Sequence, residues 1–127
     1  MGKDWLKFEK KWILNFAANI DESFINEHVY DGGFVWHVFS FEKMDSSKYL
    51  SGIEANKRYD EINKDNTYIY FHFTNKEIKM NRKYNSSKKL SKYDEIYVYS
   101  KDFSWCYIKT HEEDFGPYFI EVGYEKK

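Results

Sequence analysis

Residues 95–122 read EIYVYSKDFSWCYIKTHEEDFGPYFIEV, and this stretch decides the fold that the sequence predicts. It contains two runs rich in aromatic and β-branched residues, Glu95–Tyr99 and Ser104–Lys109. Only the short connection Ser100–Phe103 separates the runs, a pattern that is typical of a β-hairpin. A further strand is expected over Pro117–Val122. The stretch therefore predicts three consecutive strands of a mainly antiparallel sheet.

The connection before the last of these strands combines a histidine and three acids with the only proline of the chain. Gly116-Pro117 is expected to fix a turn, because proline holds φ and glycine tolerates backbone angles that other residues avoid. Three acids in a row fit poorly inside a sheet, so we expect an exposed polar loop. Its polar residues are His111, Glu112, Glu113 and Asp114.

Helices are predicted in the first third of the chain. Apolar residues at helical spacing indicate a helix over about residues 5–16, with Asp4 as its N-cap. A second short amphipathic helix is expected around Phe24–Val29, ended by Asp31-Gly32-Gly33. A capping box formed by Ser51 and Glu54 predicts a third helix, to about residue 62. The residues expected to be buried in part on this third helix are Ile53, Ala55, Tyr59 and Ile62.

Two further strands are predicted upstream of the hairpin. Phe34–Phe41 is rich in aromatic and β-branched residues on both faces, which favours a central strand. His37 would then lie among apolar side chains, as a hydrogen-bonded core histidine or, less simply, a catalytic one. Thr67–Phe73 predicts the other strand, with His72 on the face of Tyr68 and Tyr70. We therefore predict an α+β fold: one globular domain over residues 1–127, with a mainly antiparallel sheet of about five strands packed with two to three helices.

Composition and charge exclude several function classes. With 20 basic and 21 acidic residues the net charge is −1, so no global field attracts nucleic acid or an anionic membrane. The exception is the basic stretch 76–92, which we interpret as a solvated loop; nucleic-acid binding through it is the alternative. Tyr84 is its only candidate for base stacking. No apolar run is long enough to span a membrane, and no signal peptide is visible.

The sequence contains no complete catalytic or cofactor motif. Cys106 is the single cysteine, which agrees with a reducing compartment, and a buried thiol within a strand would be inert. Neither a glycine-rich phosphate loop nor a zinc motif occurs, and we expect no cofactor and no metal. A divalent-cation site formed by His111 and the following acids is a less favoured alternative. We expect the protein to be cytoplasmic.

A binding surface is the leading functional hypothesis. Aromatic and polar residues of the predicted strands and loop have the composition of an interface as well as that of a core. The candidate binding residues are Trp36, His37, Trp105, His111, Glu112, Glu113, Asp114 and Tyr118. We expect a non-enzymatic protein-interaction module with a protein partner. An immunity-type inhibitor that blocks the basic active site of a toxin is one such module. The alternative is a small hydrolase or transferase that uses His111 and Glu112.

An ordered set of motifs resembles a bacterial family. The motifs are Phe34-Val35-Trp36-His37-Val38-Phe39-Ser40, Gly52-Ile53-Glu54-Ala55, Asp102-Phe103-Ser104-Trp105, Thr110-His111-Glu112 and Gly116-Pro117-Tyr118-Phe119. Between about Trp12 and Phe119 the chain resembles domain-of-unknown-function family 4275, which is found mainly in Gram-positive bacteria. The resemblance implies a stand-alone cytoplasmic domain and supplies no activity, substrate or catalytic residue. The long basic stretch 76–92 departs from the family pattern.

Overall fold

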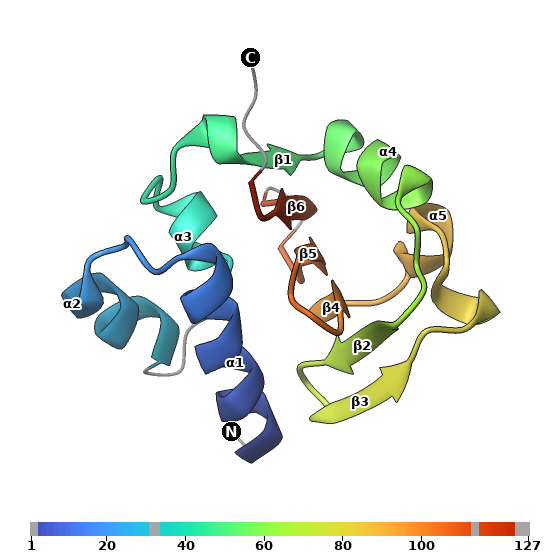
Figure 1. The fold of residues 1–127 in the computed structure, drawn as a ribbon, viewed down its shortest axis with the longest axis horizontal. Coiled ribbons are helices and arrows are strands. Elements are labelled where there is room, and N and C mark those ends of the chain that lie inside the picture. The colour runs from blue at the N-terminus through green and yellow to red at the C-terminus, as the bar shows by residue number, and fades with distance from the viewer. Residues whose placement is uncertain (1–2, 31–33, 113–114, 124–127) are drawn as a thin grey trace.

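A computed structural model describes residues 3–30, 34–112 and 115–123 of the chain. These residues form one six-stranded, fully antiparallel sheet in the order β1-β6-β5-β4-β2-β3 (Figure 1). The strands are β1 (Tyr49–Ser51), β2 (Thr67–Phe71), β3 (Lys76–Lys79), β4 (Ile96–Ser100), β5 (Trp105–Lys109) and β6 (Tyr118–Glu121). The predicted hairpin of β4 and β5 therefore lies at the centre of the sheet, a position that was predicted from the sequence for residues 34–41.

Helices cover both faces of this sheet, with α1, α2 and α3 on one side and α4 and α5 on the other (Figure 1). The α-helices of the described chain are α1 (Lys3–Phe16), α2 (Glu22–Ile25), α3 (His37–Ser40), α4 (Ile53–Glu61) and α5 (Ser87–Leu90). A π-helical turn over Asn26–Tyr30 extends α2, and 3₁₀ turns occupy Ser46–Lys48 and Arg82–Tyr84. The predicted α+β class with a mainly antiparallel sheet is confirmed.

Two hydrophobic cores result, one on each face. Alternate residues of one strand point to opposite faces, so Tyr97 and Tyr99 pack under α1 while Ile96 and Val98 pack under α4 and α5. All five residues of β4 are buried. His72 follows β2 and contacts the Trp5 ring, with 4.0 Å between centroids, so it lies on the face of Tyr70 as predicted.

The predicted central strand over residues 34–41 is wrong, because this segment contains the short helix α3. Its buried residues are Val35, Trp36, Val38 and Phe39. Their spacing of i, i+1, i+3 and i+4 is that of one helical face, which an aromatic and β-branched composition conceals. The segment packs against the face of the sheet that α1 also covers, and it does not join the sheet as a strand. The edge strand beside β6 is instead the short β1.

The boundaries of two other predicted helices also differ. α1 begins at Lys3, so Asp4 lies within its first turn and is not the N-cap. Gly52, at φ 62°, precedes α4 in place of the predicted cap Ser51, which belongs to β1. Ala55 and Tyr59 are buried on α4 and Ile62 is partly buried, as expected. The expected partial burial of Ile53 is wrong, because this side chain is 84% exposed.

The basic stretch 76–92 is more ordered than the predicted loop. Its first residues form β3, which pairs with β2, and its last residues include α5. The Tyr84 ring packs against Phe71 and Tyr93, and its carbonyl oxygen accepts a hydrogen bond from the Tyr59 hydroxyl at 2.5 Å. The proposed base-stacking residue is therefore engaged in the core under α4.

Cys106 is fully buried in β5, and burial raises the pKa of its thiol well above the usual range, as the sequence predicts for an inert residue. None of the described helices is long and apolar enough to cross a membrane.

Glu9 is an acidic residue inside the core. It lies on the buried face of α1 and is 1% exposed, with the Trp5 side chain as a weak partner whose effect on the pKa is smaller than that of burial. Burial disfavours the charged form and raises the pKa of this carboxyl from 4.5 to about 7. Between these two values the folded state binds more protons than the unfolded state, so stability falls as pH rises through this window.

We predict that Glu9→Gln removes this pH dependence. The free energy of unfolding of the wild type, measured with urea, should fall relative to the variant by at most about 3 kcal/mol between pH 4.5 and pH 8. A difference between the two proteins that stays constant over this range would show that Glu9 titrates as an ordinary surface acid.

Candidate functional site

The candidate site is built around Glu95, a fully buried acid at the start of β4. Its backbone is in the left-handed region at φ 52°, which is uncommon for residues other than glycine. Both features oppose folding, since a buried carboxylate loses its hydration and a left-handed residue is strained. They persist because the surrounding groups compensate for them.

Four hydrogen-bond donors from three segments satisfy this carboxylate. The Trp36 indole Nε1 donates to its two oxygens at 3.0 and 3.2 Å, and the Tyr97 hydroxyl donates to Oε2 at 2.6 Å. The backbone N–H of His111 donates to Oε1 at 2.9 Å, and the ring Nδ1 of the same residue lies 2.5 Å from Oε1. Burial, followed by the charge of Glu95, raises the pKa of Tyr97 well above its usual range, so its hydroxyl remains a donor.

These contacts fix the orientation of the His111 ring. Because the Glu95 carboxylate accepts, Nδ1 donates, and Nε2 points away from the core toward Glu112, whose Oε1 lies 3.3 Å away. Aromatic rings surround the imidazole, with centroid distances of 4.9 Å to Phe34 and 5.7 Å to Phe73. The buried Glu95 carboxylate therefore holds the ring through Nδ1, and Nε2 faces the exposed Glu112 carboxylate.

The Thr110 side chain closes the loop that carries His111. The Thr110 hydroxyl donates to the carbonyl oxygens of Glu112 and Phe115, and the Gly116-Pro117 peptide bond is cis. Gly116 has φ 85°, and a Cβ there would lie 3.2 Å from the Thr110 and Tyr118 side chains. The predicted turn between two strands is confirmed, and only glycine fits its tightest point.

An exposed aromatic surface surrounds His111. Phe73 is 60% exposed and Phe115 is 42% exposed, and Phe115 stacks on Trp36 at 5.9 Å between centroids. Ring contacts continue from Phe34 through His37 to Phe41, which is also exposed. We call this surface the aromatic–histidine face, and it consists of Phe34, His37, Phe41, Phe73, His111, Glu112 and Phe115.

His37 belongs to this face, and His72 adjoins it. His37 Nδ1 lies 2.7 Å from the carbonyl oxygen of His28, which can only accept, so His37 donates from this nitrogen. His72 is buried beside Phe34, and burial, with a smaller contribution from the charge of His111, lowers its pKa to about 4. His72 is therefore neutral at physiological pH and cannot act as a charged group of the site.

The structure brings together half of the residues that the sequence suggested. Trp36, His37, His111 and Glu112 lie at one place. Trp105 does not join them, because it is buried on the opposite face of the sheet, stacked on Phe119. Tyr118 is buried against the rings of Phe39 and Tyr49. Glu113 and Asp114 lie outside the described residues.

Sequence reasoning missed the residues that organise the site. Glu95 is separated from Trp36 by 59 residues and from His111 by 16, and no local pattern connects them. The available signal was an acid directly before a fully apolar strand. Phe73 was placed at the end of the predicted strand 67–73, whereas β2 ends at Phe71 and leaves Phe73 exposed beyond it. Phe115 lies in a loop, where no periodicity separates exposed from buried aromatic residues.

No group of three or more histidine, cysteine or acidic side chains is arranged to hold a metal ion within residues 3–30, 34–112 and 115–123. The basic stretch forms a separate hollow that is lined by Arg82, Lys83, Lys88, Lys89, Lys92 and Tyr93. Nucleic-acid binding there stays a prediction.

Comparison with known proteins identifies the family. A family model described as Domain of unknown function (DUF4275) matches residues 3–119. The chain belongs to this family. The match confirms the family that the sequence was expected to resemble, and the DUF4275 description assigns no activity. Searches of curated proteins and of solved structures give no match.

We predict that Glu95→Gln strongly destabilises the fold, because it places an amide donor among indole, hydroxyl and backbone donors. The free energy of unfolding should fall by roughly 2–4 kcal/mol. The matched variant Glu112→Gln removes an exposed carboxylate from the other side of His111 and should change stability by less than about 0.5 kcal/mol. Equal effects in urea unfolding would contradict the role assigned to Glu95.

Proposed function

We propose that the protein is a non-enzymatic protein-interaction module that binds its partner through the aromatic–histidine face. The observation that carries the proposal is the position of two exposed rings beside a histidine that Glu95 holds in place. Phe73 contacts the His111 ring directly, and Phe115 stacks on Trp36, which also contacts that ring. Large aromatic side chains at the centre of a surface patch are the residues that supply most binding energy in protein interfaces.

Rigidity of the patch also supports this function. His111 is held by two hydrogen bonds to Glu95, and Trp36, which supports Phe115, is held by the same carboxylate. A preorganised surface loses less conformational entropy when it binds, so more of the contact energy appears as affinity. The buried charge is thus consistent with a site that must keep its shape.

The chemistry of the partner is suggested by charge. Glu112 is exposed beside His111, and in the sequence Glu113 and Asp114 follow it directly. We propose a partner whose surface places Lys or Arg side chains around an apolar contact, as in the basic cleft of a nuclease toxin. An immunity-type inhibitor in the bacterial cytoplasm would have this form, and the single buried Cys106 agrees with a reducing compartment.

We predict that Phe73→Ser removes partner binding while preserving the fold, because the ring is mostly exposed. Loss of an aromatic anchor from an interface costs about 2 kcal/mol or more, a loss in affinity of at least about 30-fold. The matched control is Ile53→Ser, which removes an even more exposed apolar side chain from α4. Affinity capture from a bacterial lysate with wild type and both variants, quantified by mass spectrometry, measures the effect.

The proposal requires one stoichiometric protein that is recovered with the wild type and Ile53→Ser and lost with Phe73→Ser. Recovery of the same proteins by all three baits, or of none by the wild type, counts against an interface on this face.

A second candidate function is acid–base catalysis by His111, and a specific geometry favours it. A buried carboxylate on Nδ1 with Nε2 directed outward is the arrangement that orients a catalytic imidazole in hydrolases. No described hydroxyl or thiol is hydrogen-bonded to Nε2, so the attacking group would be water or the substrate itself. Purified protein that hydrolyses p-nitrophenyl acetate, with the rate lost in His111→Gln, would favour this candidate over the binding module. A rate equal to that of free imidazole excludes it.

A further inference from the structure

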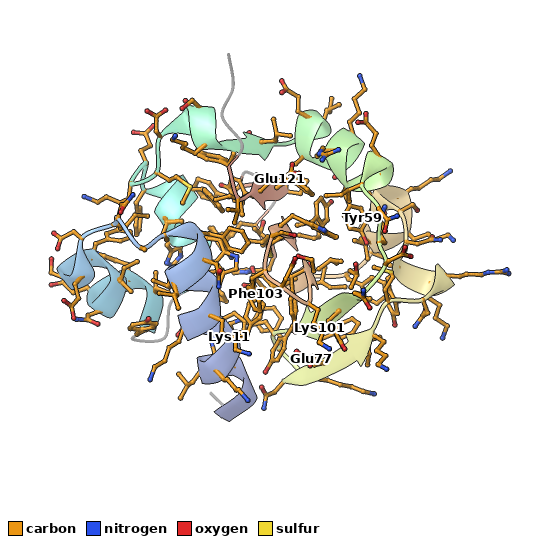
Figure 2. All side chains as sticks on the ribbon, in the orientation of Figure 1. Lys11, Tyr59, Glu77, Lys101, Phe103 and Glu121 are labelled. Carbon is orange, nitrogen blue, oxygen red and sulfur yellow. The ribbon has the colours of Figure 1, made fainter. Side chains whose placement is uncertain are left out.

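A hollow of about 490 Å³ lies between α1 and the edge of the sheet formed by β2, β3 and the β4–β5 turn. None of its lining residues belongs to the aromatic–histidine face. Figure 2 shows Lys11, Lys101, Glu77 and Phe103, which line this hollow, gathered where α1 approaches the sheet. Its volume falls within the range of about 300–1,000 Å³ that small-molecule sites occupy.

Three lysines converge on this hollow. Lys7 and Lys11 are four residues apart on α1, where like charges repel, and Lys101 approaches from the β4–β5 turn. None of the three ammonium groups forms an ion pair within the described part of the chain. The lining carboxylate, Glu77, is instead hydrogen-bonded by the Tyr99 hydroxyl. The lining therefore has an excess of two positive charges, and an anion would relieve their repulsion.

Buried aromatic rings form the floor between the lysines. Phe8 contacts Tyr99 at 4.8 Å and Phe103 at 5.7 Å between centroids, and all three rings are buried. Tyr68 is half-buried beside Tyr99, and the planes of the two rings meet at 28°. The Tyr68 ring therefore forms an aromatic wall that is partly open to solvent. A planar ring can stack on such a wall while its charged group reaches the lysines.

The turn that supplies Lys101 and Phe103 is preorganised. Phe103 has φ 56°, a strained conformation for a bulky residue, and its N–H donates to the Ser100 carbonyl oxygen at 2.9 Å. The Ser100 hydroxyl accepts from the Ser104 N–H at 2.8 Å, and the Lys101 N–H donates to the Asn66 carbonyl oxygen at 2.8 Å. The backbone on both sides of the aromatic ring is therefore fixed, as expected for a site that holds a ligand in one orientation.

We propose that this hollow binds a small phosphate monoester attached to a planar ring, the chemistry of a nucleoside monophosphate. The phosphate carries between one and a half and two negative charges at neutral pH, which matches the excess charge of the lining. Lys7, Lys11 and Lys101 contact the phosphate as point charges, and the ring stacks beside Tyr68 over the aromatic floor. This binding is separate from the protein-interaction function proposed above.

Isothermal titration calorimetry with AMP as the probe tests the proposal. We expect saturable binding with Kd in the range of ~0.01–1 mM, and binding at least about tenfold weaker for adenosine or inorganic phosphate alone. The variant Lys7→Gln/Lys11→Gln should weaken AMP binding by about tenfold or more, because charge-assisted contacts to the phosphate are lost. Both lysines are exposed, so the thermal unfolding temperature should stay unchanged.

The matched control is Lys83→Gln/Lys88→Gln, which removes two exposed lysines from the separate basic hollow. AMP affinity within about twofold of wild type in this control supports a site at α1. The proposal is overturned if millimolar AMP gives no saturable binding, if phosphate alone binds as tightly as AMP, or if both double variants weaken binding equally.

Discussion

The structure depends on one buried charge, the Glu95 carboxylate. Moving a carboxylate from water into a protein interior costs several kcal/mol, so this group is tolerated only while good donors surround it. Those donors come from the segment before α3, from β4 and from the loop between β5 and β6, through Trp36, Tyr97 and His111. The same set of hydrogen bonds therefore fixes three elements that are distant in sequence and directs a histidine toward the surface. A substitution of Glu95 therefore changes the stability of the fold and the geometry of the site together.

The layered architecture explains where the exposed aromatic residues of the site lie. The central strands are apolar on both faces, and helices cover each face, so the tyrosines and tryptophans of the sheet are used in two cores (Figure 1). Phe73 and Phe115 lie in the connections beyond the strand ends, where no helix covers them. Scattered exposed apolar residues are normal for proteins. Here Phe73 contacts the ring of His111, and Phe115 stacks on Trp36. Both exposed rings therefore rest on side chains that Glu95 holds in place.

Much of the fold could be predicted from sequence because its elements are local. The hairpin of β4 and β5, the helix α1 and the final strand each have a pattern that occurs within a few residues. The prediction for residues 34–41 was wrong because a short apolar run fits a buried strand and one helical face equally well. Only the packing of this segment against the sheet distinguishes the two structures. The site was predictable in part: His111, Glu112 and Trp36 were identified by chemistry, but their link through Glu95 depends on tertiary contacts. Trp105 was misplaced because the register that assigns it to the opposite face is set by pairing with β6.

The orientation of the His111 ring is the most direct test of the account. A solvent-exposed neutral histidine carries its proton mainly on Nε2, whereas the Glu95 contact requires the proton on Nδ1. Two-bond ¹H–¹⁵N NMR correlation of the imidazole, recorded at a pH at which the ring is neutral, distinguishes these tautomers. The account predicts the Nδ1-protonated form in the wild type and in Glu112→Gln. The Nε2-protonated form in the wild type would contradict it, since the Glu95 carboxylate would then not hold the ring.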